Sequence, residues 1–238
     1  MKLSILNEIS LFHNVSDSTL QRLMIVSKYR SYQKNSLILN YDNSNKNFIY
    51  IAKGWLKLCR VSLDGEEIIL EILHSKQCYG ETIILDSHAE QGYIAYAITD
   101  AKCVIIPLNV LRELVVNDHN LAINIIHLIA SKISLHKAQI EHLSIQNSTQ
   151  RIACFFLRLM NYTNEETKKS IYLPYHKYLI SKKVGCRAET FSRSLVQLHK
   201  ICGLTTSNSH IYIKNPLMLS NYTCQKCSRT FPCHLNID

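Results

Sequence analysis

The spacing of apolar residues changes at Pro107, and this change divides the chain into parts with different folds. Before it, from Tyr29 to Ile106, short runs rich in Ile, Val, Tyr and Leu alternate with polar turns, which predicts β-strands. After it, apolar residues recur at three- and four-residue steps, which predicts helices. Asp64-Gly65, between two of the runs, is a strong signal for a β-hairpin. The predicted strands are residues 36–39, 48–51, 56–60, 68–72, 94–97 and 103–106.

Several short strands at such spacing predict a small antiparallel sandwich or barrel. Residues 1–28 are expected to be helical, and Ser16 or Asp17 is placed to cap the second helix there. A short helix is predicted from Leu108 to Val115. Residues 1–117 are therefore expected to form one β-rich domain with helices at its N-terminus.

A long helix is predicted over residues 118–147, with Asp118 as its cap. From Ala122 it carries a stripe at alternating four- and three-residue steps, apolar at every position except His136. Such a stripe is typical of a coiled-coil seam, and a two-fold dimer is the commonest way to cover one. An amphipathic helix packed on its own domain is the alternative. The predicted dimer seam consists of Ile126, Ile129, Ile133, His136, Ile140 and Leu143.

Two short amphipathic segments, residues 175–183 and 188–199, are joined by a turn at Gly185. Glycine reaches positive φ without a steric penalty, so it suits a sharp turn. Two helices joined in this way are typical of a helix-turn-helix, whose second helix enters a DNA major groove. The apolar positions expected to face inward are Tyr178, Leu179, Val184, Phe191, Leu195 and Leu198.

Glu189, Ser192 and Arg193 share the opposite face of the second segment. An arginine side chain binds guanine through two hydrogen bonds, and a carboxylate accepts a hydrogen bond from the amino group of cytosine. A hydroxyl can form a hydrogen bond with either base. An ordinary helical hairpin with a charged, solvated face is the alternative.

A helix at 150–162, a loop at 161–170 and a β-hairpin at 202–213 are also predicted. Residues 148–220 therefore suit a winged helix-turn-helix, in which the hairpin is the wing.

The composition favours a polyanionic partner. The 238 residues carry a formal net charge of +9 and the pI is about 9.1, so the surface should attract nucleic acid. No signal peptide and no apolar run of about eighteen residues are found, so we expect a cytoplasmic protein without a membrane partner. Without an export signal, nine cysteines favour thiols or metal ligands over disulfides. We find no phosphate loop, nucleophile elbow or paired carboxylates, and we do not expect an enzyme.

Several motifs occur in a characteristic order: Leu11-Phe12, the run from Phe48 to Gly54, Asp64-Gly65, Tyr79-Gly80-Glu81, the long helix, and the run from Gly185 to Arg193. Over residues 8–220 the chain thereby resembles the CRP/FNR superfamily of bacterial transcription regulators. The resemblance implies an α+β fold with an N-terminal double-stranded β-helix (a jelly-roll, cyclic-nucleotide-binding-like sensor domain). A dimerisation helix and a C-terminal winged helix-turn-helix follow. It also implies a homodimer on a double-stranded DNA operator, with RNA polymerase as a further partner.

The second helix of the helix-turn-helix resembles the FNR branch, since Ala188 stands where CRP-like members carry Arg. That branch reads TTGAT half-sites, here expected as an inverted repeat with centres about 34 Å apart. By this resemblance Glu189 accepts from cytosine, Arg193 binds guanine, and Ser192 contacts a thymine or phosphate. Arg187 takes the usual Ser/Thr cap position, where its charge can contact phosphate, and Thr190 completes the predicted DNA-contacting set.

Cyclic AMP is not expected to be the effector. Family members that bind it hold the phosphate with an Arg-Ser pair, and the matching positions here are Gln91-Gly92. Glutamine cannot supply the cationic, bidentate clamp that a phosphate prefers. Glu81 is retained, and we interpret it as marking a turn of the fold rather than a ribose contact.

The tail, residues 221–238, carries Cys224, Cys227 and Cys233 in the spacing Cys-x2-Cys-x5-Cys. This spacing resembles the iron–sulfur cysteines of FNR proteins, some of which carry the set at the C-terminus. The resemblance implies a [4Fe–4S] cluster whose fourth ligand is a carboxylate near the end of the dimer helix. Glu141 is the candidate, ahead of His142 and Cys154. Loss of the cluster to oxygen or nitric oxide would then release the tail from the helix and shift the DNA-reading helices.

Other interpretations stay open. The tail could hold a structural zinc ion, closed by a ligand such as His234, or no metal at all. The regulator could then respond to another small molecule or to its own abundance, or a sensor module could act through a partner protein. Activation and repression both agree with these motifs. The remaining cysteines are interpreted as small buried apolar side chains, at positions 59, 78, 103, 154, 186 and 202.

Overall fold

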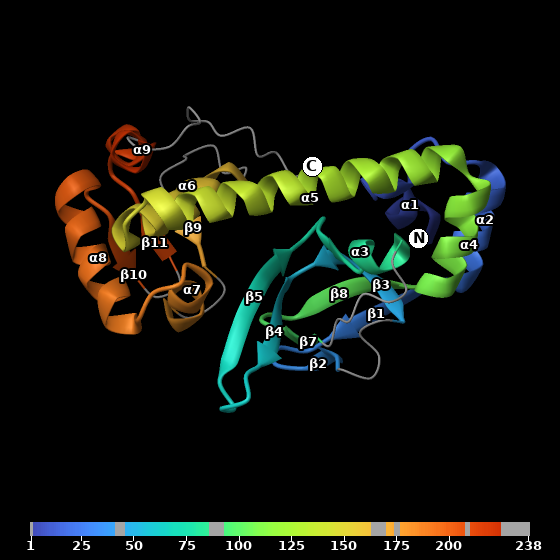
Figure 1. Ribbon diagram of the computed structural model, residues 1–238, viewed down its shortest axis with the longest axis horizontal. Coiled ribbons are helices and arrows are strands. Elements are labelled where there is room, and N and C mark those ends of the chain that lie inside the picture. Colours follow the sequence, from blue (N-terminus) through green and yellow to red (C-terminus); the bar gives the residue numbers. More distant parts are fainter. Residues whose placement is uncertain are drawn as a thin grey trace. The chain divides into compact units, whose positions relative to one another are not determined.

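The computed structural model describes residues 2–40, 46–85, 93–162, 170–173, 177–207 and 210–224. The chain divides into two compact units, the first ending at Ile133 and the second beginning at Ser134. The long helix α5 (His119–Ile145) contributes residues to both units. Each unit has its own buried core. Figure 1 labels the helices and strands of both units.

Short helices begin the first unit, as predicted. They are α1 (Lys2–Asn7), the 3-10 helix η1 (Ser10–Phe12) and α2 (Asp17–Val26). Ser16 caps α2, because its hydroxyl oxygen accepts a hydrogen bond from the Thr19 amide at 3.3 Å. Leu11, Phe12 and Leu23 are buried in the core that these helices share with the strands.

Within the described residues, the strands of the first unit form two four-stranded antiparallel sheets, with orders β1-β8-β3-β6 and β2-β7-β4-β5. The core contains the fully buried Phe48, Ile51 and Ile106, and β3 is buried at four consecutive positions, 48–51. This is the predicted jelly-roll domain. The strands are β1 (Lys28–Tyr32), β2 (Leu37–Leu39), β3 (Asn47–Lys53), β4 (Trp55–Val61), β5 (Glu67–His74), β6 (Cys78–Tyr79), β7 (Ile94–Ala97) and β8 (Ala101–Pro107).

The six predicted strands and the hairpin at Asp64-Gly65 are confirmed, while β1 and β6 were not predicted. β1 consists mainly of polar residues, exposed or half-buried, so it lacks an apolar alternation. β6 contains only two residues, which is too short for any periodicity. The positions Gln91-Gly92 lie outside the described residues.

The helices α3 (Glu81–Leu85) and α4 (Leu108–Asn117) complete the first unit together with the start of α5. As predicted, Asp118 caps α5, and its Oδ1 accepts from the Leu121 amide at 3.1 Å. Its Oδ2 accepts from the amide and the hydroxyl of Ser16 at 2.9 and 2.8 Å, which ties α2 to α5. Burial acts to raise the pKa of Asp118, but hydrogen bonds from Ser16, Thr19 and Leu121 lower it to about 2.

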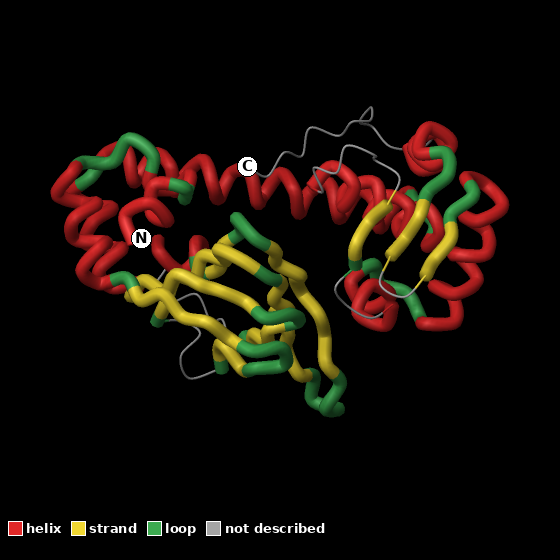
Figure 2. Tube along the Cα trace, turned by 180° about the vertical axis from the view of Figure 1, so that it is seen from behind, coloured by secondary structure: helices red, strands yellow, loops and turns green. Residues whose placement is uncertain are grey.

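The second unit is a winged helix-turn-helix, whose three antiparallel strands lie side by side in the order β10-β11-β9 (Figure 2). The predicted helices and wing hairpin are confirmed, whereas β9 and α9 were not predicted, and the first residue of β9, Ser170, was assigned to a loop. α9 continues past residue 220 to Cys224, and its apolar Leu217 and Met218 are exposed, so it shows no regular stripe. The elements are α6 (Ser148–Tyr162), β9 (Ser170–Tyr172), α7 (Lys177–Lys183), α8 (Ala188–Cys202), β10 (Thr205–Ser207), β11 (His210–Tyr212) and α9 (Pro216–Cys224).

One predicted core position of α7 is wrong. Tyr178 was expected to face inward, but it is 54% exposed, whereas Ile180 is fully buried. Residues four apart share a helix face, so the buried Val184 places Ile180, rather than Tyr178, toward the core.

Candidate nucleic-acid interface

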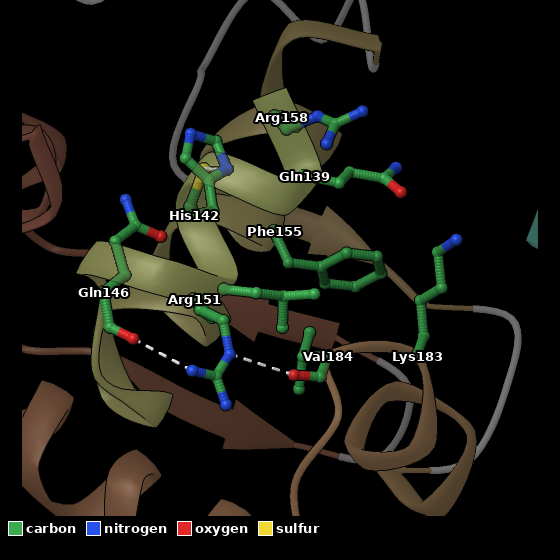
Figure 3. A pocket seen from close by; sticks show the side chains of 10 residues that line it. Gln139, His142, Gln146, Arg151, Phe155, Arg158, Lys183 and Val184 are labelled. Atoms are coloured by element: carbon green, nitrogen blue, oxygen red, sulfur yellow. Dashed lines mark hydrogen bonds between the residues drawn. The ribbon is translucent and has the colours of Figure 1, made fainter. Parts of the chain in front are cut away.

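The turn between α7 and α8 is held by a side chain from α6. Arg151 donates from Nε to the carbonyl of Val184 at 3.1 Å and from Nη2 to the carbonyl of Gly185 at 3.4 Å. Its Nη1 donates to the carbonyl of Gln146 at 2.9 Å (Figure 3). Gly185 has a φ of +67°, a conformation that side chains with a Cβ rarely adopt. Glycine and Arg151 together therefore set the geometry of the helix-turn-helix.

The inner face of α8 is anchored by apolar and polar contacts. Phe191 and Leu198 are 2% and 0% exposed. Beside them, the hydroxyl of Thr149 on α6 lies 3.0 Å from the hydroxyl of the buried Ser194 and 3.0 Å from Oε1 of Gln197. These contacts fix which face of α8 points outward.

The outward face carries the predicted DNA-contacting residues. The side chains of Glu189 and Arg193 are 83% and 80% exposed, and Oε2 lies 3.6 Å from Nη2. Ser192 is exposed and donates its hydroxyl to the carbonyl of Ala188 at 3.1 Å. Arg187 stands at the N-cap without a side-chain capping bond, as predicted. Thr190 is half-buried, so it is the least accessible member of the set.

The helix-turn-helix is rich in cationic side chains. The last turn of α7 ends with Lys182 and Lys183, and Lys177 donates to the hydroxyl of Thr206 on the wing at 3.2 Å. From residue 177 to 202 the sequence contains a single carboxylate, that of Glu189. The helix-turn-helix is therefore suited to a polyanion.

The predicted seam residues lie along the exposed face of α5. Ile126, Ile133, Ile140 and Leu143 are 55%, 49%, 64% and 58% exposed, and His136 is also exposed. Ile129 departs from this pattern, because it packs in part against the core of the first unit. Soluble proteins rarely leave so regular an apolar stripe in water, which indicates a surface that another chain covers.

In the first unit, Glu81 already has an internal cationic partner. Its Oε1 lies 2.7 Å from Nζ of Lys132 on α5, which also donates to the Cys78 carbonyl at 3.0 Å and lies 3.9 Å from Glu71. Burial would lower the pKa of Lys132, but the carboxylates of Glu81 and Glu71 raise it, so the ammonium stays charged. Glu81 is thus more than a turn marker, because it binds the long helix to the β-roll.

Of the tail cysteines, Cys224 lies in the described part of the chain, at the end of α9, whereas Cys227 and Cys233 lie outside it. α9 is bonded to the segment after α5, where Nε2 of Gln146 donates to the Thr223 carbonyl at 3.3 Å. Within the described ranges no three His, Cys, Asp or Glu residues are grouped to hold a metal ion, and Glu141 belongs to no such group. Sγ of Cys154 lies 3.8 Å from Nδ1 of His142, and both are buried.

Cysteines outside the tail behave as apolar core residues, as predicted. Cys59, Cys78, Cys103, Cys154 and Cys202 are buried, and Cys186 is half-buried. Burial is the main cause that raises the pKa of Cys59, Cys78 and Cys103 to about 12 in each case. Because the thiolate is the reactive form, these thiols are inert near neutral pH.

Three residues that organise these sites were not predicted: Thr149, Arg151 and Lys132. Lys132 lies between Leu128 and Leu135 on the inward-facing side of α5. A cation within such an apolar stripe could have indicated a buried ion pair. Polar residues near the start of an amphipathic helix are common, so Thr149 and Arg151 gave no comparable signal.

Comparison with known proteins agrees with this architecture. Residues 29–118 match the cyclic nucleotide-binding domain family. A global nitrogen regulator from Synechococcus elongatus is 24% identical over 173 residues, covering 71% of this chain and 78% of that protein. A cyclic AMP receptor protein from Thermus thermophilus is 25% identical over 154 residues, covering 63% and 69%. The solved structure of a CRP/FNR-family transcriptional regulator from Thermus thermophilus matches with a TM-score of 0.66 at 20% identity, over 84% of this chain and 100% of that one.

The cyclic nucleotide-binding domain at residues 29–118 and the fold shared with a solved CRP/FNR-family regulator confirm the predicted resemblance and fold class. None of the helices in the described ranges combines the length and the hydropathy needed to cross a bilayer.

Proposed function

We propose that the chain is a dimeric regulator that binds one DNA sequence specifically through α8. The observation that carries this proposal is the division of α8 into a buried face, with Phe191 and Leu198, and an exposed face with Glu189 and Arg193. The second helix of a helix-turn-helix enters the major groove with its N-terminal residues toward the bases. The exposed Glu189 and Arg193 both lie in the N-terminal half of α8.

The side chains on this face have complementary roles. Arg193 binds guanine O6 and N7, and Glu189 accepts from the amino group of cytosine. Their mutual ion pair is exposed and is worth only about 0–1 kcal/mol, so it opens at little cost when DNA binds. Ser192 contacts a neighbouring thymine or phosphate, and Arg187 contacts phosphate. A half-site of the TTGAT type supplies the required guanine and cytosine partners.

We propose that a second copy of the chain covers the exposed stripe of α5. Ile126, Ile133, Ile140 and Leu143 supply its apolar surface, and His136 restricts the register of the two helices. A two-fold dimer carries two copies of α8, so the operator is an inverted repeat with half-sites about 34 Å apart. RNA polymerase is the proposed protein partner at the promoter.

Cyclic AMP is not the proposed effector, because Gln91 and Gly92 stand where family members that bind it carry an Arg-Ser pair. Glutamine cannot supply the cationic, bidentate clamp that a phosphate prefers. Titration calorimetry is therefore expected to show no micromolar binding of cyclic AMP.

For the tail, we propose a [4Fe–4S] cluster held by Cys224, Cys227 and Cys233, with Glu141 as the fourth ligand. The bond between Gln146 and Thr223 supports this, because it holds the start of the tail beside the segment that follows α5. Thiolates and a carboxylate suit iron, and a cluster of this type would supply sensitivity to oxygen. Anaerobic protein should contain iron, and Cys224→Ser should lose it while Cys186→Ser keeps it. Iron-free protein with zinc, or without any metal, would exclude the cluster.

The DNA proposal is tested by fluorescence anisotropy with duplexes that carry an inverted TTGAT repeat or the same bases scrambled. We expect the repeat to bind at least ~10³-fold more tightly, with an affinity that falls steeply with salt as phosphate contacts release counterions. Equal affinity for both duplexes would contradict the proposal. No binding to either duplex would favour a sensor module that acts through a partner protein.

A further inference from the structure

One exposed residue of α8 does not fit a purely charged, solvated surface. Val196 is 59% exposed, and it is the one large apolar side chain of α8 that is exposed, in a helix that the structure describes from end to end. Valine is also a poorer helix former than alanine, because its branched Cβ loses freedom of rotation in a helix. The neighbouring exposed positions are polar or charged, namely Glu189, Ser192, Arg193, Gln197 and Lys200.

Val196 lies on the face of α8 that carries the proposed DNA contacts. It follows Glu189 by seven residues, and a seven-residue separation returns to within about 20° of the same direction around a helix. It points about 140° away from the buried Phe191. Ala188 is also exposed, but it lies only about 60° from Phe191, at the flank of the helix. Val196 is therefore the apolar member of the outward face.

The rotation of α8 at this point is fixed by the residue that follows Val196. Oε1 of Gln197 lies 3.0 Å from the hydroxyl of Thr149 on α6, and Nε2 of Gln197 donates to the hydroxyl of Tyr222 on α9 at 3.4 Å. The next residue, Leu198, is fully buried. These contacts hold Val196 outward, and its branched side chain has few rotamers, so its methyl groups keep a defined direction.

The outward residues have a spacing that recognition helices use to contact bases. The recognition helix of homeodomains reads the major groove through positions i, i+3, i+4 and i+7, and Glu189, Ser192, Arg193 and Val196 have this spacing. Val196 lies about 4.5 Å further along the helix axis than Arg193, little more than the ~3.4 Å step between base pairs. It can therefore reach a base pair next to the guanine that Arg193 binds. In TTGAT both of these neighbouring pairs contain a thymine.

We propose that Val196 contacts the C5 methyl group of a thymine in a base pair next to that guanine. The methyl group distinguishes thymine from the other bases in the major groove, and apolar side chains recognise it. Burial of one methyl group corresponds to about fourfold in affinity. The inference rests on the proposed function, and it adds a determinant of specificity to Glu189 and Arg193, which read the G·C pair.

Fluorescence anisotropy of the full chain tests this contact, with inverted TTGAT repeats in which one thymine of each half-site is replaced by deoxyuridine. Deoxyuridine lacks only the methyl group and keeps every hydrogen-bonding group. At one of the thymines next to the guanine, replacement in both half-sites should weaken binding about sixteenfold, which is about fourfold for each half-site. Val196→Ala should bind the unmodified repeat with a similar loss, and the same replacement should then cost it less than about twofold.

Val116→Ala is the matched control, because Val116 is 85% exposed on α4 in the first unit. It should show the same affinity and the same loss with deoxyuridine as the unchanged protein. Alanine favours the helix, so Val196→Ala should be at least as stable as the unchanged protein in urea unfolding.

Two results would overturn the proposal and leave operator recognition standing. One is specific binding of the repeat with no loss at either thymine next to the guanine. The other is an equal loss on replacement for Val196→Ala and the unchanged protein. Equal affinity for the repeat and its scrambled counterpart would instead contradict the proposed function, and the role of Val196 would fall with it.

Discussion

Two contacts between a glutamate and a cation, one in each unit, differ in almost every physical respect. Glu81 and Lys132 are 2.7 Å apart, with side chains that are 8% and 11% exposed. Glu189 and Arg193 are 3.6 Å apart, with side chains that are 83% and 80% exposed. A contact between a carboxylate and a cation therefore stabilises the fold in the first unit and remains available for a partner in the second.

The difference follows from the solvent around each pair. A buried charge that loses its counter-ion cannot regain hydration, so Lys132 and Glu81 depend on each other. In an exposed ion pair, each side chain can replace its contact with the other by contacts with water at almost no cost in free energy. Glu189 and Arg193 can therefore separate and form hydrogen bonds with DNA bases. Exposure, rather than the presence of the ion pair, identifies the recognition surface.

Breaking the buried pair should have the largest effect on stability. Lys132→Met leaves Glu81 and Glu71 without their ammonium partner and should lower the free energy of unfolding by about 3–5 kcal/mol. Urea unfolding of the full chain, followed by circular dichroism, measures this. Glu189→Gln is the matched control in the exposed pair and should change it by no more than ~0.5 kcal/mol. Similar losses in both variants would remove the contrast between the two pairs.

Breaking the exposed pair should instead affect DNA binding. Arg193→Ala should weaken binding to the inverted TTGAT repeat by about 1–3 kcal/mol, because a bidentate contact to guanine is lost. Its unfolding curve should match that of the unchanged protein, since the Arg193 side chain is 80% exposed. Footprinting titrations give the affinities. An operator bound with unchanged affinity by Arg193→Ala would show that this face of α8 does not read bases.

Asp118 offers an intermediate case, a buried carboxylate held by neutral donors instead of a cation. Its pKa is lowered to about 2 in the folded chain, so its charged form stabilises the fold above the unfolded value of about 4. That contribution is lost as the pH falls from about 4 toward 2. Asp118→Asn should therefore be about 1–2 kcal/mol less stable near pH 6, and the gap should close in acid. A gap that does not vary with pH would contradict this role.

The strands and helices with regular apolar spacing could be predicted from sequence. The apolar runs of β3, β4 and β8 and the helical stripe of α8 each supply residues that the core buries. β1, β6 and β9 escaped prediction because they are short or polar, and register with a neighbouring strand defines them. No local pattern encodes such pairing.

The outward face of α8 was predictable for the same reason, because positions opposite Phe191 and Leu198 must point to solvent. Contacts between segments that are far apart in the sequence could not be predicted in this way. The bonds from Arg151 to the turn and from Lys132 to Glu81 join residues far apart in sequence. Only the folded chain brings these groups together.

The stoichiometry of the DNA complex tests the central claim most directly. Sedimentation velocity with a duplex that carries one inverted TTGAT repeat should show two chains per duplex. Ile133→Asp, which places a charge in the exposed stripe of α5, should sediment as a folded monomer and lose tight binding. One chain bound per repeat with full affinity, unaffected by Ile133→Asp, would contradict the account.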